Sequence, residues 1–434
     1  MGDHIPCEVL VSIFLACRSS SAFDTDHGAM VISHVCRRWR DIALNDACEI
    51  WAILTIEVDL GRSMVLPLLY LDRSKYALLD LTFNANAFMC VGSLHLQWAV
   101  DILLSHIHRI SELRIYTCHD LVLEQIFRAL AGMVAPRLTT FQVVQQDEIY
   151  SNAQGLCILE GGSPMLKSVS MILALPILPM RNLTDIELAM INFHPPLSFR
   201  QMLNSSKDTL KTLKLSSVSF DPTEMTTDMG DPIVLPELRV FKISLPACGL
   251  QQVIPRYVSA PALHTLIVAN CGGFALKDLF DGWAKHTMTS VEHLVVLDIR
   301  DLEVAHLAGG FNIIPNIRHL EVVHSDPSAW LSALTKGTMK KRGRGGRSER
   351  EKRERMALLH VGAETRLPWV KLAEVELRCP AEAHRVLEML RTRASAGLPL
   401  KRLGYVRSVG KVDIGSQLKG LVQNGLQIVH CQEL

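Results

Sequence analysis

The 434-residue sequence predicts an α/β protein: a small N-terminal helical unit, then an irregular α/β solenoid with a parallel sheet on its concave face. Two amphipathic segments of helical period lie within residues 1–51, and a six-residue apolar pattern recurs through residues 52–434. Segments of helical period also lie between many copies of that pattern. Strands that alternate with crossover helices must run parallel, and such crossovers are right-handed almost without exception.

The first helix is expected from Pro6 to Cys17. Proline suits the first helical turn because its missing N–H would be unpaired there, and Glu8 favours the positive end of the helix dipole. The apolar residues of this segment recur at three- and four-residue steps and form one stripe: Val9, Leu10, Ile13, Phe14 and Cys17.

A second helix is expected after the polar segment that ends at Gly28. Its apolar side consists of Ile32, Val35, Cys36, Trp39, Ile42 and Ala43, and its opposite side of Arg37, Arg38, Arg40 and Asp41. Neither helix is long enough to bury its apolar stripe alone. Part of the two stripes must therefore pack between the helices, and part must face outward.

These residues resemble the F-box, in the form common in mushroom-type fungal proteins. The resemblance rests on four segments in order and spacing: IPCEVL (residues 5–10), Ile13-Phe14, SHVCRRWRDIA (residues 33–43) and Ile50-Trp51. It implies that residues 1–51 dock on the Skp-type adaptor of a cullin ubiquitin ligase. The implied adaptor contacts are Ile5, Pro6, Glu8, Val9, Leu10, Phe14, Val35, Cys36 and Trp39. Core packing explains Ile13, Ile42 and Trp51 at least as well.

The rest of the chain repeats the pattern apolar-x-x-apolar-x-apolar. Copies start at Ile53, Leu78, Ile110, Leu138, Leu166, Leu183, Leu210, Leu238, Leu263, Leu294, Ile317, Leu372 and Leu400. Most steps are 23 to 32 residues, close to the period of a leucine-rich repeat, whereas the 17-residue step from Leu166 is too short for a helix. The alternative is a doubly wound α/β domain, which usually has fewer strands and a glycine-rich first turn.

A basic segment interrupts the repeats at about residues 336–357. Its core, Lys336 to Arg355, is rich in lysine, arginine and glycine, so it cannot bury enough apolar surface to become ordered. We expect a solvated, disordered insertion. The alternative is a nuclear-localisation or nucleic-acid-binding patch. We favour the solvated insertion, because the segment has no aromatic residue that could stack on bases.

Composition and motifs predict a binding protein without catalytic residues or cofactors. The 45 basic and 44 acidic residues nearly cancel, so no strong field attracts nucleic acid or a membrane surface. No apolar run approaches the roughly 18 residues of a membrane span. No glycine-rich phosphate loop, nucleophile elbow or H-E-x-x-H motif is present. The 11 scattered cysteines suit a reducing compartment, the cytoplasm or nucleus.

The F-box resemblance implies the function of a substrate receptor in an SCF-type ubiquitin ligase. Such a receptor binds the adaptor, through it a cullin, and a protein substrate, which is unknown here. The substrate is expected on the concave sheet, at the outward positions of the pattern: Glu112, Arg114, Gln142, Lys167, Asp185, Glu187, Lys211, Lys214, Arg239, Lys242, His264, Arg318, His319, Glu321, Glu374 and Glu376. Their mixed charges indicate a polar, partner-specific surface. The alternative is a repeat scaffold, or a nucleic-acid-associated protein, whose N-terminal helices only cap the solenoid.

Overall fold

The computed structural model describes fourteen stretches of the chain. These are residues 5–18, 28–58, 65–86, 93–146, 155–193, 199–220, 231–245, 254–255, 258–283, 288–336, 367–379, 381–406, 422 and 425–431. The chain divides into two compact units, Met1–Leu210 and Lys211–Leu434. Both units are α/β, and the strands of the main sheet run parallel.

The first unit begins with helices. These are α1 (Cys7–Arg18), α2 (Gly28–His34), α3 (Arg37–Asn45) and the 3-10 helix η2 (Cys48–Trp51). The expectation of one continuous second helix is wrong, because α2 ends before Val35. Cys36 has extended backbone angles (φ −159°, ψ 171°), and its Sγ accepts a hydrogen bond from the Trp39 N–H at 3.4 Å. Cys36 is thus the N-cap of α3, which explains the break.

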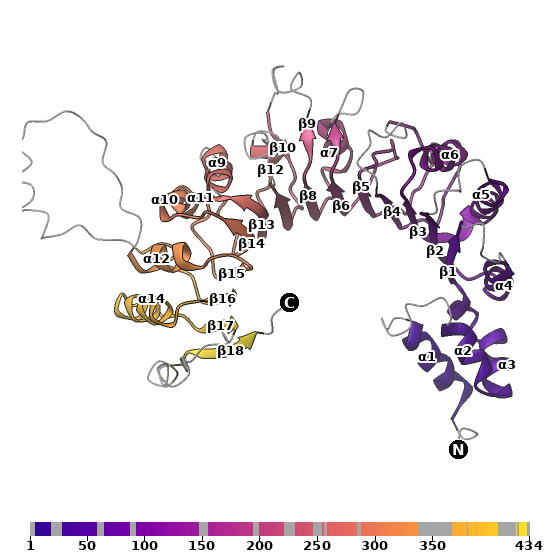
Figure 1. The fold of residues 1–434 in the computed structure, drawn as a ribbon, viewed down its shortest axis with the longest axis horizontal. Coiled ribbons are helices and arrows are strands. Elements are labelled where there is room, and N and C mark those ends of the chain that lie inside the picture. Colours follow the sequence, from indigo (N-terminus) through magenta and orange to yellow (C-terminus); the bar gives the residue numbers. More distant parts are fainter. Residues whose placement is uncertain are drawn as a thin grey trace, which may run out of the picture. The chain divides into compact units, whose positions relative to one another are not determined.

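Six neighbouring parallel strands follow in the first unit. They are β1 (Ile53–Glu57), β2 (Leu79–Ala85), β3 (Ile110–Thr117), β4 (Thr140–Gln145), β5 (Ser168–Ile172) and β6 (Asp185–Ala189). The helices of this part are α4 (Val65–Arg73), α5 (Leu94–His106), η4 (Ile107–Arg109), α6 (Asp120–Leu130) and α7 (Phe199–Ser206), and the short strand β7 is Asn192–Phe193. Helices α4, α5 and α6 lie on one face of the strands (Figure 1).

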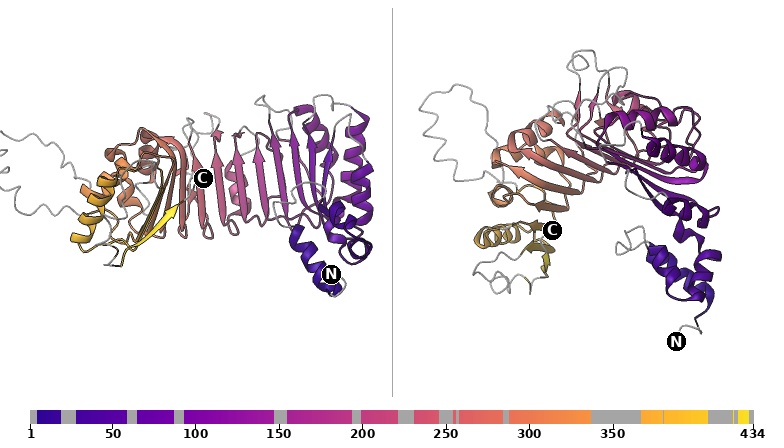
Figure 2. Two further views of the ribbon diagram at one scale, coloured as in Figure 1. Left: turned by 60° about the horizontal axis from the view of Figure 1, so that its bottom comes forward. Right: turned by 45° about the vertical axis from the view of Figure 1, so that its right-hand side comes forward.

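The second unit contains eight strands of the same kind. They are β8 (Thr212–Ser216), β11 (Val240–Ser244), β13 (Thr265–Gly272), β14 (His293–Arg300), β15 (His319–Val323), β16 (Glu374–Arg378), β17 (Arg402–Val406) and β18 (Gln427–Cys431). The short strands are β9 (Ser219–Phe220), β10 (Ile233–Val234) and β12 (Val258–Ser259). The helices are α9 (Gly273–Trp283), α10 (Val304–Leu307), α11 (Gly310–Ile313), α12 (Ser328–Lys336) and α14 (Ala383–Ser395). Figure 2 shows α12 and α14 on one side of the strands.

Every copy of the apolar pattern coincides with a strand of the sheet, which confirms the predicted parallel strands. In most copies the three apolar positions face the core: Leu210, Leu213 and Leu215, for example, are each 0% exposed, whereas Ile53 and Leu78, which start the first two copies, are 37% and 49% exposed. The last strand, β18, was not predicted, although Leu426, Val429 and Cys431 fit the same pattern. Residues 173–184, between β5 and β6, contain no helix, as the short step predicted.

Turns with a shared geometry lead into many strands. The N–H of the first apolar residue donates to the carbonyl oxygen three residues earlier, as in Leu166 to Ser163 (3.1 Å) and Leu263 to Ala260 (3.2 Å). Proline follows the accepting residue in both turns. Its fixed φ stabilises the second position of such a turn. These turns set the register in which each strand joins its neighbour.

Two further expectations concern membranes and the basic insertion. In the described stretches, no helix combines the length and apolar character needed to cross a bilayer. Lys336 is the last residue of α12, and the remainder of the predicted insertion lies outside the described residues.

Candidate functional site

The N-terminal helices pack around a small aromatic core. The Phe14 and Trp39 rings, from α1 and α3, lie 4.9 Å apart between centroids. Phe14 and Leu10 are each 1% exposed, and Ile42 of α3 is also buried. Leu10 and Phe14 were expected to touch the adaptor. In this structure they instead hold α1 against its neighbours, so they have no surface to offer a partner.

The other seven predicted contact residues keep some exposure. Pro6, Glu8, Val9, Val35 and Cys36 are exposed, and Ile5 and Trp39 are half-buried. Ile42 and Trp51 are buried in the core, as expected for residues explained by core packing. Ile13 is 42% exposed, so core packing does not explain it.

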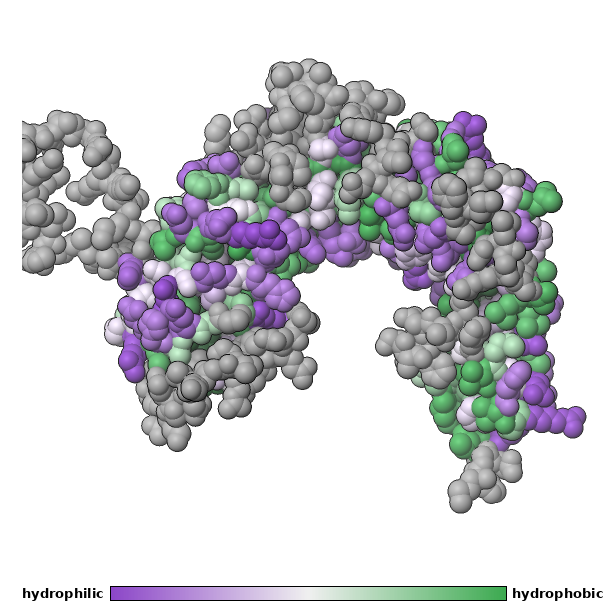
Figure 3. Space-filling model, viewed as in Figure 1, coloured by the Kyte–Doolittle hydropathy of each residue, from purple (hydrophilic) through white to green (hydrophobic). Residues whose placement is uncertain are grey.

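Four apolar side chains of these helices face solvent. They are Val9 and Ile13 on α1, Val31 on α2, and Val35 directly after α2, with exposed fractions of 42–56%. Val9 and Ile13 are separated by four residues within α1, which places them on one side of that helix. Figure 3 shows hydrophobic residues gathered on the viewed side of the N-terminal helices. We call these four side chains the apolar helix face.

Polar contacts fix the helices that carry this face. The Arg38 guanidinium donates to the Ile5 carbonyl oxygen and lies 3.8 Å from the Cys7 Sγ, so α3 holds the start of α1. The Arg40 Nε donates to the Ser33 carbonyl oxygen of α2 at 3.0 Å. The sequence predicted only that these arginines lie on the polar side of the second helix. It did not predict that they join the helices.

Trp51 joins the helices to the first strand and helix of the sheet. Its ring is fully buried, and its Nε1 donates to the Ala43 carbonyl oxygen at 2.8 Å. The Tyr70 ring of α4 meets it edge-on with centroids 5.1 Å apart, and the Arg73 guanidinium lies 4.5 Å from its centroid. Since Trp51 is anchored on both sides, the helices are held against α4.

The second candidate surface is the sheet face of the second unit opposite its buried positions. Arginine–glutamate ion pairs link neighbouring strands, or the residues directly before them: Arg318–Glu292 at 3.2 Å, Arg378–Glu321 at 3.0 Å and Arg402–Glu374 at 3.4 Å. Three histidine rings each lie 3.8 Å from a glutamate carboxylate: His264 from Glu292, His293 from Glu321 and His319 from Glu376. Charges of both signs alternate along this ladder, which gives a polar face rather than a single-sign groove.

Two histidines of this ladder stack. The His293 and His319 rings on β14 and β15 are nearly parallel, at 8°, with centroids 4.4 Å apart. Burial, assisted by the positive charges that His319 and His264 can carry, lowers the pKa of His293 to about 4. His293 is therefore neutral at pH 7, and its ring packs as a flat, largely apolar surface.

The corresponding face of the first unit is also polar. The Ser111 hydroxyl donates to the Asp80 carboxylate at 2.8 Å across β2 and β3, and Arg114 pairs with Glu112. Glu112 also lies opposite Thr140 of β4 in register. Within the described residues, no group of three or more histidine, cysteine or carboxylate side chains is arranged to hold a metal ion.

The fold and these two surfaces define an α/β protein with an N-terminal helical unit and a large parallel sheet. No family model matches the sequence, and no curated protein matches it either.

Proposed function

We propose that the chain is the substrate-recognition subunit of an SCF-type cullin ubiquitin ligase. In this proposal residues 1–51 are an F-box that docks the Skp-type adaptor, and residues 52–434 are an irregular leucine-rich-repeat-like solenoid that binds a protein substrate. The order and spacing of the residues that resemble the F-box support the first part. The strands that recur at each copy of the apolar pattern support the second.

The apolar helix face is the observation that carries the proposal. Val9, Ile13, Val31 and Val35 are exposed, whereas Leu10, Phe14 and Ile42 of the same helical unit form its core. Exposed apolar side chains on adjacent helices suit helix-mediated docking, in which a few anchors dominate the affinity. Leu10 and Phe14 contribute indirectly in this proposal, because their buried packing orients α1 so that Val9 and Ile13 face outward.

The substrate lies on the polar sheet face in this proposal. Cross-strand charges such as Glu321, Glu374 and Arg378 offer many hydrogen-bonding groups, which favours a specific protein partner. The chemistry contributed by the chain is proximity. A substrate lysine held near a charged ubiquitin reacts at a raised effective concentration, and no residue of the receptor needs to take part in bond making.

Capture of the adaptor by the full chain tests the proposal. Tagged full-length protein is co-expressed with a Skp-type adaptor and recovered on affinity resin. We expect near-stoichiometric adaptor with the wild type and at least a roughly tenfold loss with Ile13→Glu or Val35→Glu, since each places a charge in an apolar contact.

Asn45→Glu is the matched control, because Asn45 is exposed at the end of α3 and outside the apolar helix face. It adds the same charge and should capture as much adaptor as the wild type. Failure of the wild type to retain the adaptor would favour the scaffold reading, in which the helices only cap the repeats. Equal retention by the wild type, Ile13→Glu and Val35→Glu would reject this docking face.

A further inference from the structure

Strand β1 is an outer strand of the main sheet. It pairs with β2 on one side, and no other described strand pairs with it. The Ala52 carbonyl oxygen accepts from the Asp80 N–H, and the Val58 N–H donates to the Asn84 carbonyl oxygen. In a parallel pair, alternate residues direct both backbone groups to the same neighbour. The even-numbered residues from 52 to 58 therefore face β2, and Ile53 and Thr55 direct their N–H and C=O groups to the open side.

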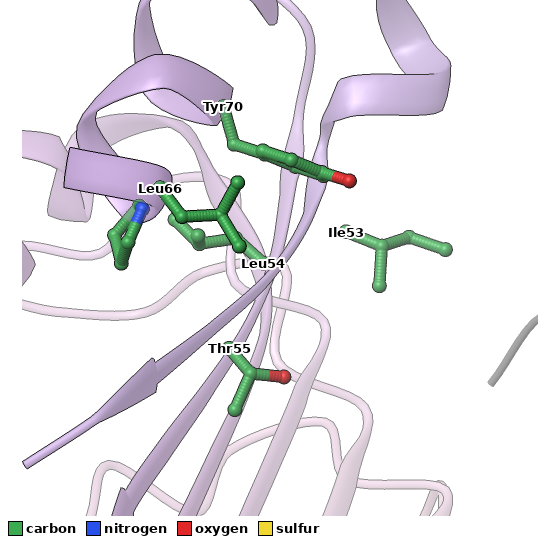
Figure 4. A pocket seen from close by; sticks show the side chains of 6 residues that line it. Ile53, Leu54, Thr55, Leu66 and Tyr70 are labelled. Atoms are coloured by element: carbon green, nitrogen blue, oxygen red, sulfur yellow. The ribbon is translucent and has the colours of Figure 1, made fainter. Parts of the chain in front are cut away.

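A shallow recess lies beside this open side. It is lined by Ile53, Leu54, Thr55, Leu66, Pro67 and Tyr70, and encloses about 170 Å³ of space that is open to solvent. Figure 4 shows Leu66 and Tyr70 of α4 above β1, from which Ile53 and Thr55 project. That figure includes open solvent in front of the recess, so the enclosed part is much smaller than the roughly 300 Å³ at which small-molecule pockets begin. A single apolar side chain laid against the recess fits it better than a ligand molecule.

Within the described residues, β1 also lacks the lysine and proline that usually protect an outer strand against strand addition. Outer strands are commonly blunted by lysine or proline, whereas β1 reads ILTIE, a sequence with high strand propensity. Ile53, the first residue of the strand, is 37% exposed. An unprotected edge with backbone donors and acceptors beside an apolar recess is complementary to one kind of partner, an extended peptide.

We propose that β1 binds an extended segment of the substrate protein by strand addition, with one apolar side chain of that segment in the recess beside Tyr70. The Ile53 and Thr55 side chains stand in register with Asp80 and Thr82, on the polar sheet face assigned to the substrate above. A segment that lies on the polar face of the first unit, where Ser111 meets Asp80, can pair with β1 at the edge of that same face. That the partner is the substrate protein rests on the proposed function. That its bound segment is extended follows from the backbone donors and acceptors of the β1 edge.

A backbone-modified peptide tests this inference. The probe is a fluorescein-labelled peptide of alternating threonine and leucine with a lysine at each end, titrated with the full chain and followed by fluorescence anisotropy. Its control has the same sequence with alternate backbone amides N-methylated, which removes donors without changing side chains. We expect the first peptide to bind, the second to bind roughly tenfold more weakly, and amide exchange at Thr55 to slow on binding.

Three variants locate the site. Thr55→Pro removes an edge donor at a position where strands tolerate proline, and should weaken binding roughly tenfold. Leu66→Lys alters the recess and should also weaken it. Leu68→Lys is the same substitution two residues along α4, outside the recess lining, and should stay within about twofold of the wild type.

Several results would overturn strand addition at β1. They are no binding by the wild type, equal binding of the N-methylated peptide, or unchanged binding by both Thr55→Pro and Leu66→Lys. A wild-type dimer that Thr55→Pro converts to a monomer in sedimentation velocity would assign the edge to a second copy instead. Adaptor capture by the same preparations is measured in parallel. If the wild type captures no adaptor, the proposed function is refuted. If it captures the adaptor but does not bind the peptide, only strand addition at β1 is refuted.

Discussion

Single buried arginines satisfy backbone groups at the joints between elements. The Arg393 guanidinium in α14 is 0% exposed and donates to the Pro368 carbonyl oxygen at 3.0 Å and the Trp369 carbonyl oxygen at 2.9 Å. Arg109 similarly donates to the Leu71 carbonyl oxygen and the Ser74 hydroxyl, just after α4. Burial lowers the pKa of Arg393 to about 10, which still leaves it charged at pH 7.

Arg393→Leu should lower the free energy of unfolding by about 2–4 kcal/mol. The apolar substitute leaves the carbonyl groups of Pro368 and Trp369 buried without a donor. Urea unfolding followed by circular dichroism measures the change. Arg391→Leu, at an exposed position of the same helix, is the control and should change stability by less than about 0.5 kcal/mol. Equal midpoints for the two variants would show that the hydrogen bonds of Arg393 do not stabilise this joint.

The depressed pKa of His293 predicts a pH dependence of stability. The unfolded chain binds the His293 proton near pH 6.5, but the folded chain binds it only near pH 4. Between these values the unfolded state holds more protons, so stability falls as the pH falls. The full effect is at most about 3 kcal/mol, reduced by the partial exposure of the ring.

Urea midpoints measured from pH 7.5 to pH 4.5 test this dependence. His293→Gln should flatten the profile between pH 6.5 and pH 5, because the group that resists protonation is gone. His384→Gln, whose ring is mostly exposed, should retain the wild-type slope in that window. If His293→Gln and the wild type share one profile, the stacked pair with His319 does not resist protonation in the folded protein.

At the scale of elements, the apolar pattern predicted a strand at each of its copies, and segments of helical period predicted helices between many of them. A strand such as β4 alternates buried and partly exposed residues, and that two-residue period is visible in the sequence. The break between α2 and α3 was missed because Cys36 sits at a position of the apolar stripe. Its capping role depends on the backbone angles of one residue, and cysteine is not among the residues that usually signal an N-cap.

The residues of the candidate site were predicted less well than the elements that carry them. Both flanks of α1 are apolar, so periodicity alone could not separate the inward Leu10 and Phe14 from the outward Val9 and Ile13. That choice is made by the packing of α1 against α3 and η2. The left-handed residues that follow strands were also missed, because Leu173 and Met190 carry no local sign of a positive φ.

Trp51→Phe should weaken the junction between the N-terminal helices and α4. The change removes the buried hydrogen bond to the Ala43 carbonyl oxygen and part of the contact with Arg73, with an expected loss of about 2 kcal/mol. Thermal and urea unfolding measure the loss. Trp98→Phe, on α5 with a partly exposed ring, is the matched control and should have a smaller effect. A larger loss for Trp98→Phe would place the stabilising contact elsewhere.

At the scale of the whole chain, we propose separate tasks for separate surfaces. The apolar helix face is assigned to the adaptor, and the polar sheet face with the β1 edge to the substrate. Apolar anchors suit a contact that is the same for every substrate, whereas mixed charges suit a contact that discriminates between partners. Substitutions on one surface should therefore leave binding at the other unchanged when the two sites are independent.

Calorimetric titration of the purified full chain with a purified Skp-type adaptor tests the central claim most directly. We predict a one-to-one complex whose binding enthalpy becomes more negative with temperature, because apolar surface is buried. Ile13→Glu should abolish this signal and Asn45→Glu should preserve it. Absence of binding heat for the wild type at every temperature, or an unchanged isotherm for Ile13→Glu, would contradict the account.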